Sequence, residues 1–379
     1  MARVHLAIHK HFRKLKDPRR AHRRRHALLD IIVIALCAVI CGANDWQQVV
    51  TFARRRYDWL KGFLELPNGI PSHDTFERVF DRLDPARFQL CFRDWMQALS
   101  EALAIKQIAI DGKTLRGSGT SKLGPLHLVS AWAAANPLSL GQVAVDGKSN
   151  EITAIPRLLD ILDVEGALVT IDAMGCQKDI AAAIRAKKGD YLLTVKDNQP
   201  TLLEDIQQCF ERAFDADFAG VEHSEYTTKG RGHGRTETRS YTIITDPAGL
   251  RHRALWPDLC VIGLCVSERT VTGQPTTAEA RYFIGSRRAG ARVYGQALRH
   301  HWGIENNLHW QLDVSFREDE NRVSKRHEAE NLAVLRKLAL VLLKQQPGKE
   351  SIACKRLAAA LDTAFLEEVI RGAGKSGNG

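Results

Sequence analysis

The chain has 379 residues, 44% of them hydrophobic and 26% charged, and carries a formal net charge of +10. This composition is ordinary for a globular protein of two or three domains, and no apolar run reaches the roughly 20 residues that a membrane-spanning helix requires. The eight cysteines form no Cys-x-x-Cys pair, so we expect a reduced, cytoplasmic protein without a membrane partner.

The positive charge is concentrated at the start of the chain. Residues 1–26 hold ten lysines or arginines, among them Arg23, Arg24 and Arg25, against the single acid Asp17, so about +1 remains for all later residues. Such a block repels itself and stays extended until it meets a polyanion, whose condensed counterions it releases. It could be a solvated tail, but beside the motifs described below it favours DNA as the partner.

Residues 27–104 are expected to be helical. The apolar run at 28–41 predicts a buried helix, and apolar residues at three- and four-residue steps predict another over 46–63. Further helices are predicted from an N-cap at Ser72 to about residue 83, and from Pro85 onward.

The turn and helix at residues 70–83 could belong to a helix-turn-helix DNA reader. His73, Arg78 and Arg82 would then face outward. Packing helices that carry a few basic residues are commoner, so this alternative stays open.

From residue 107 the apolar pattern changes to that of strands alternating with helices. Strands are predicted at 107–110, 126–135, 138–145, 167–171 and 191–195, with Asn136-Pro137 as a hairpin signal. Helices are predicted at 151–162, capped by Asn150, and at 178–187 and 200–214. Three meandering strands followed by crossover helices that return parallel to the first strand is the topology of the RNase H-like fold.

Residues 215–290 interrupt this pattern with turn-rich sequence typical of β-structure. Three strands are predicted, at 237–244, 259–270 and 277–284, with a glycine-spaced basic loop at 229–235 before them. Helices return at 293–312, 328–344 and 351–364, and the tail 372–379 is expected to be disordered.

These patterns predict an α/β protein with an RNase H-like core and a β-rich insertion, preceded by an all-α N-terminal domain. The expected division is a basic arm (1–26), a helical domain (27–104), a core (105–214 and 291–345), an insertion (215–290) and a C-terminal helix with its tail (346–379).

Two of the predicted strands end alike, in Ile-Ala-Ile-Asp at Asp111 and Val-Thr-Ile-Asp at Asp172. If the strands are neighbours, the two carboxylates emerge side by side and raise each other's pKa unless a cation lies between them. Mg²⁺ fits such a position, and a pair of ions can drive phosphodiester chemistry. Aspartates at strand ends are also common as turn formers or helix caps.

A third carboxylate is available in the segment 300–310. Trp302, Glu305 and His309 are spaced to share one helix face. The histidines nearby leave a zinc site as an alternative, in which only His301 and His309 could converge with Glu305.

Long ordered blocks of this sequence resemble the ISAs1 family of insertion-sequence transposases, of the H-repeat-associated type. The resemblance begins near Arg23 and runs to about residue 365. The blocks are LPNGIPSHDTF (66–76), DGKTLRGS (111–118), GPLHLVSAW (124–132), KSNEI (148–152), TIDAMGCQ (170–177), HWGIEN (301–306) and DVSFRED (313–319).

The resemblance implies a DDE transposase, with Asp111, Asp172 and Glu305 on the triad positions and two Mg²⁺ or Mn²⁺ ions as cofactor. It also implies terminal-inverted-repeat DNA and target DNA as substrates and a homodimer on DNA. The wider IS4-like group has Tyr, Arg and Lys around its catalytic Glu, where this chain has Leu298, His301 and Leu312. The acidic cluster 313–320 is a rival source of the third ligand.

Basic and polar residues near these motifs are the candidates for contacts to DNA, beside the N-terminal arm with Arg23, Arg24 and Arg25. They are Lys113, Arg116, Lys196, Asn198, Arg231, Arg235 and Arg299. Glu151 is interpreted as a helix-start acid rather than a ligand.

The sequence thus favours a transposase that cuts at its element's ends and joins them to target DNA. A transposase-derived DNA-binding repressor without catalysis is the alternative, and a host nuclease on the same fold is a third. The presence of all three acids within the family's blocks speaks against both.

Overall fold

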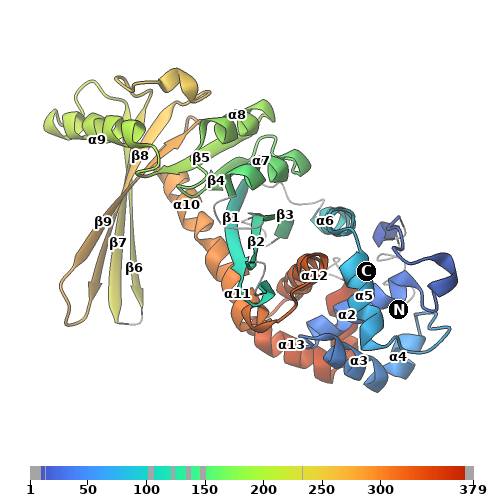
Figure 1. Ribbon diagram of the computed structural model, residues 1–379. Helices are drawn as coiled ribbons and strands as arrows, with labels where there is room; N and C mark the ends of the chain where they lie inside the picture. The colour runs from blue at the N-terminus through green and yellow to red at the C-terminus, as the bar shows by residue number, and fades with distance from the viewer. Residues whose placement is uncertain are drawn as a thin grey trace, which may run out of the picture.

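Figure 1 shows the computed structural model, which describes residues 10–12, 14–100, 106–120, 124–133, 138–145, 151–232 and 234–371, excluding the side chains of residues 23 and 96–100. Nine strands in this part of the chain form one mixed sheet, in the order β3-β2-β1-β4-β5-β9-β8-β7-β6. The strands are β1 (Gln107–Leu115), β2 (Leu126–Ala133), β3 (Leu138–Val145), β4 (Leu168–Ile171), β5 (Asp190–Val195), β6 (His223–Gly232), β7 (Arg235–Thr245), β8 (Val261–Val271) and β9 (Thr277–Gly285).

Helices cover the sheet and form a separate bundle at one end of it (Figure 1). The helices are α2 (Leu28–Ile40), α3 (Trp46–Arg55), α4 (Tyr57–Lys61), α5 (His73–Arg82), α6 (Pro85–Ser100), α7 (Glu151–Ile161), α8 (Lys178–Ala186), α9 (Pro200–Asp215), α10 (Ala291–His301), α11 (Trp310–Val314), α12 (Arg326–Gln345), α13 (Ile352–Leu361) and α14 (Thr363–Arg371). The expected mixed α/β class and helical N-terminal region are both confirmed.

The helical bundle is built around α2. Residues 31–40 are at most 2% exposed, as expected for a core helix, and α3, α12, α13 and α14 all pack on α2. Helices from the N-terminal and C-terminal parts of the described chain therefore share one hydrophobic core. No helix in the described ranges is long and apolar enough to cross a membrane.

Two predicted helices of this bundle are each broken in two. The helix expected over 46–63 is α3 and α4, interrupted at Arg56, whose guanidinium donates to the carbonyl of Ala360 at 2.6 Å. The helix expected over 351–364 is α13 and the start of α14. The two are separated at Asp362, which adopts extended backbone angles. Both breaks lie beside helices that pack on α2. The periodicity of apolar residues along the sequence does not show contacts of this kind.

The first five strands have the order and directions that the sequence predicts. β1 pairs antiparallel with β2 and parallel with β4, β2 pairs antiparallel with β3, and β4 pairs parallel with β5. The expectation that the first strand ends at Asp111 is wrong, because β1 continues to Leu115 along β2. Only its pairing with β4 stops at Ile110, so the two strands separate at Asp111.

The two faces of this sheet carry different cores. Ile108 and Ile110 pack with α7, α8 and α9, whereas Ala109 packs with the helical bundle. Because strand side chains alternate, Asp111 belongs to the same face as Ala109. That is the face on which α10 contacts β1 and β4.

The segment 215–290 extends the central sheet instead of standing apart from it. It holds four strands, not three, and β9 pairs antiparallel with β5. The basic loop expected at 229–235 is also wrong, since β6 runs to Gly232 and β7 begins at Arg235. In Figure 1 these strands project from the sheet as a long arm.

The long helix expected over 293–312 is also interrupted. α10 is followed by a π-helical turn, Glu305–His309, and then by α11. Turns of this type inside helices are frequent at functional sites. The hairpin signal at residues 136–137, the cap at residue 150 and the tail 372–379 lie outside the described residues.

Candidate active site

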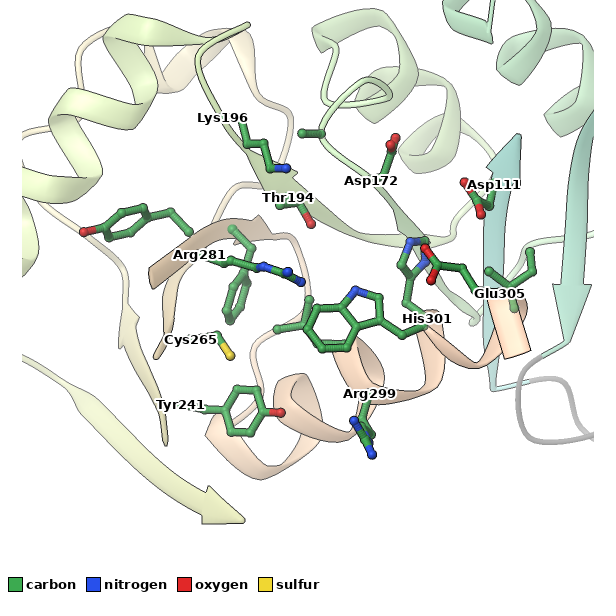
Figure 2. A pocket seen from close by; sticks show the side chains of 16 residues that line it. Asp111, Asp172, Thr194, Lys196, Tyr241, Cys265, Arg281, Arg299, His301 and Glu305 are labelled. Carbon is green, nitrogen blue, oxygen red and sulfur yellow. The ribbon is translucent and has the colours of Figure 1, made fainter. Parts of the chain in front are cut away.

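Two aspartates lie side by side where β1 and β4 separate (Figure 2). The parallel register pairs Ile110 with Ile171, so the residues that follow, Asp111 and Asp172, lie at the same edge. Oδ1 of Asp111 accepts a hydrogen bond from the next backbone N–H at 2.9 Å, and Oδ1 of Asp172 accepts one from the N–H of Met174 at 3.1 Å. The local backbone therefore orients both carboxylates.

Glu305 reaches the same place from the π-helical turn after α10. It is exposed, and Figure 2 shows its carboxylate on the side of the cavity where Asp111 and Asp172 lie. The three acids line one cavity of about 250 Å³. The structure thus brings together the three carboxylates that the sequence singles out.

The electrostatics of Asp111 reflect this convergence. Burial raises its pKa to about 7, helped by the negative charges of Asp172, Glu305 and Glu151 and opposed by the hydrogen bond from Gly112. A cation among these carboxylates would remove the repulsion.

Two further side chains flank Asp111. Nδ1 of His309 lies 3.5 Å from its Oδ2, so Glu305 and His309 of one π-helical turn both face the aspartate pair. Glu151 is buried, and its Oε1 lies 2.6 Å from Nε2 of His127. The interpretation of Glu151 as a helix-start acid is confirmed, since it begins α7, and its carboxylate is also paired inside the protein against the backbone beside Asp111.

The donors of the cavity suit a hard divalent ion. Asp111, Asp172 and Glu305 offer only oxygen ligands, and Mg²⁺ binds through one or two carboxylates together with water and phosphate oxygens. The zinc alternative is weakened because Nδ1 of His301 is engaged by another group. It lies 3.0 Å from the Thr170 hydroxyl. As the side chains are placed in the described ranges, no three His, Cys, Asp or Glu residues already form a metal-binding group, so the three acids share a cavity without converging on one point.

Cationic side chains complete the lining of the cavity. Lys196 and Arg299, both predicted to contact DNA, line it together with Arg281, which the sequence did not single out. Arg281 lies over the ring of Trp302 at 4.3 Å from its centroid, and Arg239 lies 5.4 Å from the same centroid. Arg281 comes from β9, so its place beside the acids follows only from the pairing of β9 with β5.

Lys113 is not placed to meet a phosphate. Its side chain is 9% exposed, and Nζ lies 2.7 Å from Asp313, 3.1 Å from Glu318 and 3.3 Å from Asp319. The same contacts occupy the acidic cluster that was the rival source of a third metal ligand. Lys113 pairs with the cluster without balancing its three carboxylates, none of which lines the cavity of Asp111 and Asp172, and Arg116, 82% exposed, joins through Asp319.

The other DNA-contact candidates lie away from the cavity. Asn198 donates to the carbonyl of Ala173 at 2.7 Å, and so braces the loop that follows Asp172. Arg231 and Arg235 are exposed at the end of the β6–β7 hairpin. Their contact with DNA stays a prediction.

The N-terminal arm is not free along its described length. Arg19 makes a bidentate contact with Asp17 and donates to the carbonyl of His26 at 2.7 Å, and Arg24 lies 3.6 Å from Asp17. Arg24 and Arg25 are exposed, and the side chain of Arg23 lies outside the described residues. The expectation of an extended arm is therefore wrong for this part, because Asp17 binds arginines that follow it in the sequence and holds the backbone in a compact loop.

The IS4-like positions that this chain fills differently carry no positive charge, although Leu298 and His301 line the same cavity. Leu312 is fully buried, Leu298 packs against a hydrophobic core, and burial lowers the pKa of His301 to about 4. A neutral His301 does not supply the positive charge of an arginine. Arg281 and Arg299 supply cationic groups to the same cavity instead.

Comparison with known proteins identifies the family of the chain. The profile described as "Transposase DDE domain" matches residues 103–342, which include all three acids. The chain belongs to the DDE transposase family. A second profile, described as "DDE_Tnp_1-associated", matches residues 9–96, which cover the N-terminal helices of this DDE transposase.

Two relatives align with the DDE transposase over nearly its whole length. "Putative transposase YncI" of Escherichia coli O157:H7 is 40% identical, over 94% of this chain and 92% of the relative. "H repeat-associated putative transposase YhhI" of Escherichia coli K12 is 37% identical, over 97% of this chain and 98% of the relative. Among solved structures, a piggyBac transposase synaptic complex with hairpin DNA aligns with 98% of this chain and 79% of its own at 9% identity and a TM-score of 0.39, a likeness too low to carry an argument.

Proposed function

We propose that this chain is an active transposase that cuts DNA at the terminal inverted repeats of an insertion sequence and joins the ends to target DNA. The observation that carries the proposal is the single cavity lined by Asp111, Asp172 and Glu305 with Lys196 and Arg299 around them. Carboxylates that converge beside cations are what phosphodiester chemistry needs, because the backbone of DNA is anionic and the reaction develops further charge.

The proposed catalytic domain is an RNase H-like core of residues 105–214 and 291–345. Support comes from the strand order β3-β2-β1-β4-β5 and from the mixture of antiparallel and parallel pairs in it. We further propose that 27–104 is a DNA-binding helical domain, that 215–290 is an insertion into the core, and that 1–26 and 346–379 are flanking segments.

Asp111, Asp172 and Glu305 are the proposed ligands of two Mg²⁺ or Mn²⁺ ions. When bound, such ions polarise the phosphodiester and activate the attacking oxygen. The chain's own groups do the rest: the backbone beside the aspartates holds their carboxylates in position. Lys196, Arg281 and Arg299 attract and orient the phosphates.

The substrates would be the element's ends and the target DNA. A homodimer would hold two ends together, as the resemblance implies, in the bacterial cytoplasm on the nucleoid. The exposed Arg24, Arg25, Arg116, Arg231 and Arg235 would add phosphate contacts, which position DNA without reading its sequence.

The test is cleavage and joining by purified full-length protein, on a duplex carrying the element's own ends, with Mg²⁺ or Mn²⁺. We expect the wild type to cut and join, and Asp111→Ala, Asp172→Ala and Glu305→Ala each to bind the ends without chemistry. A wild type that binds the ends but never cuts with either metal would favour the repressor. Cutting without joining would favour the nuclease.

A further inference from the structure

A second polar cavity lies between the basic arm and the start of α5, within the helical bundle. Its volume is about 480 Å³. The residues that line it are Arg19, Arg25, His26, Asn68, Ile70, Ser72, Thr75, Arg78 and Val79. None is acidic, and none belongs to the site of the three carboxylates.

The cavity carries positive charge that the described part of the chain does not neutralise. Arg25 and Arg78 are exposed, and neither forms an ion pair within that part. Arg78 bonds only to a backbone carbonyl, that of Asp74. Asp17 is engaged by Arg19, so the two free guanidinium groups give the cavity a surplus of positive charge.

The hydroxyl groups of Ser72 and Thr75 also line the cavity. Ser72 holds the N-cap position of α5 but makes no capping hydrogen bond; its hydroxyl instead lies 3.1 Å from that of Thr75. The backbone N–H of Thr75 donates to the carbonyl of Ser72 at 2.9 Å, so the groups of this helix start that face a ligand are the two hydroxyls. Nδ1 of His26 is buried and has no hydrogen-bond partner in the described structure. Hydroxyl groups beside guanidinium groups attract an anion with several acceptor oxygens.

The walls hold the cavity open before any ligand arrives. The guanidinium of Arg19 is fixed between Asp17 and the carbonyl of His26, and the amide of Asn68 donates to the carbonyl of Arg25. The arm is therefore tied to the loop before α5. This fixed part of the wall loses little conformational entropy when a ligand binds.

We propose that this cavity binds a phosphate of the DNA backbone, with Arg25 and Arg78 as its charged contacts and Ser72 and Thr75 as hydroxyl donors. Ile70 and Val79 provide an apolar wall for the neighbouring sugar. The proposal rests on the proposed function only in taking DNA as the substrate. It names where the helical bundle grips the DNA, apart from the site of chemistry.

The test is the affinity of full-length Arg25→Ala and Arg78→Ala for a labelled duplex carrying the element's end, by fluorescence anisotropy at several salt concentrations. Each variant should bind roughly tenfold more weakly, because it loses a charge-assisted contact. The slope of log affinity against log salt should become shallower by about one. Arg54→Ala is the matched control, since Arg54 is an exposed arginine of α3 outside the cavity.

Unchanged affinity and slope in both variants would overturn the proposal. A site for free phosphate ions would also overturn it. In that case inorganic phosphate would raise the unfolding temperature of the wild type above its value in chloride of equal ionic strength. The two variants would lose this effect but bind DNA normally. Failure of the proposed function looks different, because the wild type would then fail to cut the same duplex. If the wild type cuts the duplex and both variants bind it normally, the proposed phosphate site is refuted and the proposed function is not.

Discussion

Replacing Lys113 by methionine tests whether this lysine is structural, as its contacts indicate, or a DNA contact, as its position beside Asp111 first suggested. Its Nζ lies within 4 Å of three carboxylates, and the side chain of Glu318 is only 1% exposed. Methionine keeps the length of the side chain but leaves the buried carboxylate with Arg336 alone, at 3.9 Å.

Removing one partner of a buried ion pair costs about 3–5 kcal/mol, because the other charge stays buried without compensation. We expect Lys113→Met to lower the free energy of unfolding by about that amount. Lys188→Met is the control: its pair with Glu165 is exposed on both sides, and exposed pairs contribute about 1 kcal/mol or less.

The assay is urea unfolding followed by tryptophan fluorescence, with Glu318→Gln added to Lys113→Met as a second step. The double variant should recover part of the stability that Lys113→Met loses, since glutamine leaves no unpaired buried charge. If Lys113→Met is as stable as the control but binds end DNA much more weakly, the reasoning is refuted and the lysine is a DNA contact.

Three further predictions follow from buried contacts near the site. Gly112→Ala should lose about 1–3 kcal/mol in urea unfolding, because its Cβ would lie 2.7 Å from Cδ of Glu151; unchanged stability would mean that this carboxylate does not pack there. His309→Ala should need roughly tenfold more Mg²⁺ for half-maximal cleavage and for metal-induced thermal stabilisation, because it loses the contact that orients Asp111; an unshifted Mg²⁺ titration would contradict this. Burial lowers the pKa of Lys337 from 10.5 to about 8, so between these pH values the unfolded chain binds more protons than the folded one. The free energy of unfolding of the wild type should therefore rise with pH in this range, relative to that of Lys337→Met. Equal pH profiles of the two proteins would refute this prediction.

The sequence predicts the central part of this fold because its signals are local. The first five strands alternate with amphipathic helices, and the rules of strand connection leave few topologies for that order. The aspartate pair follows from the same pattern, since parallel strands that end alike bring Asp111 and Asp172 together. Glu305 follows from its helix and from the family resemblance.

What the sequence does not predict depends on contacts between distant segments. β6 escapes detection because it has no buried face: exposed and half-buried residues alternate along most of its length. Arg281 enters the cavity only because β9 pairs with β5, a pairing between segments 80 residues or more apart. The same is true of Lys113, which is some 200 residues away from the carboxylates that neutralise it.

The most direct test of the central claim is strand transfer from pre-cut element ends by Glu305→Gln, compared with Asp111→Asn, Asp172→Asn and the wild type. Pre-cut ends isolate the joining step, and these substitutions keep the shape of each side chain while removing its charge. If the three acids form one catalytic site, the wild type joins the ends to target DNA and every variant binds them without joining. Joining by Glu305→Gln at the wild-type rate would contradict the account, because the carboxylate on the π-helical turn would then play no part in the chemistry.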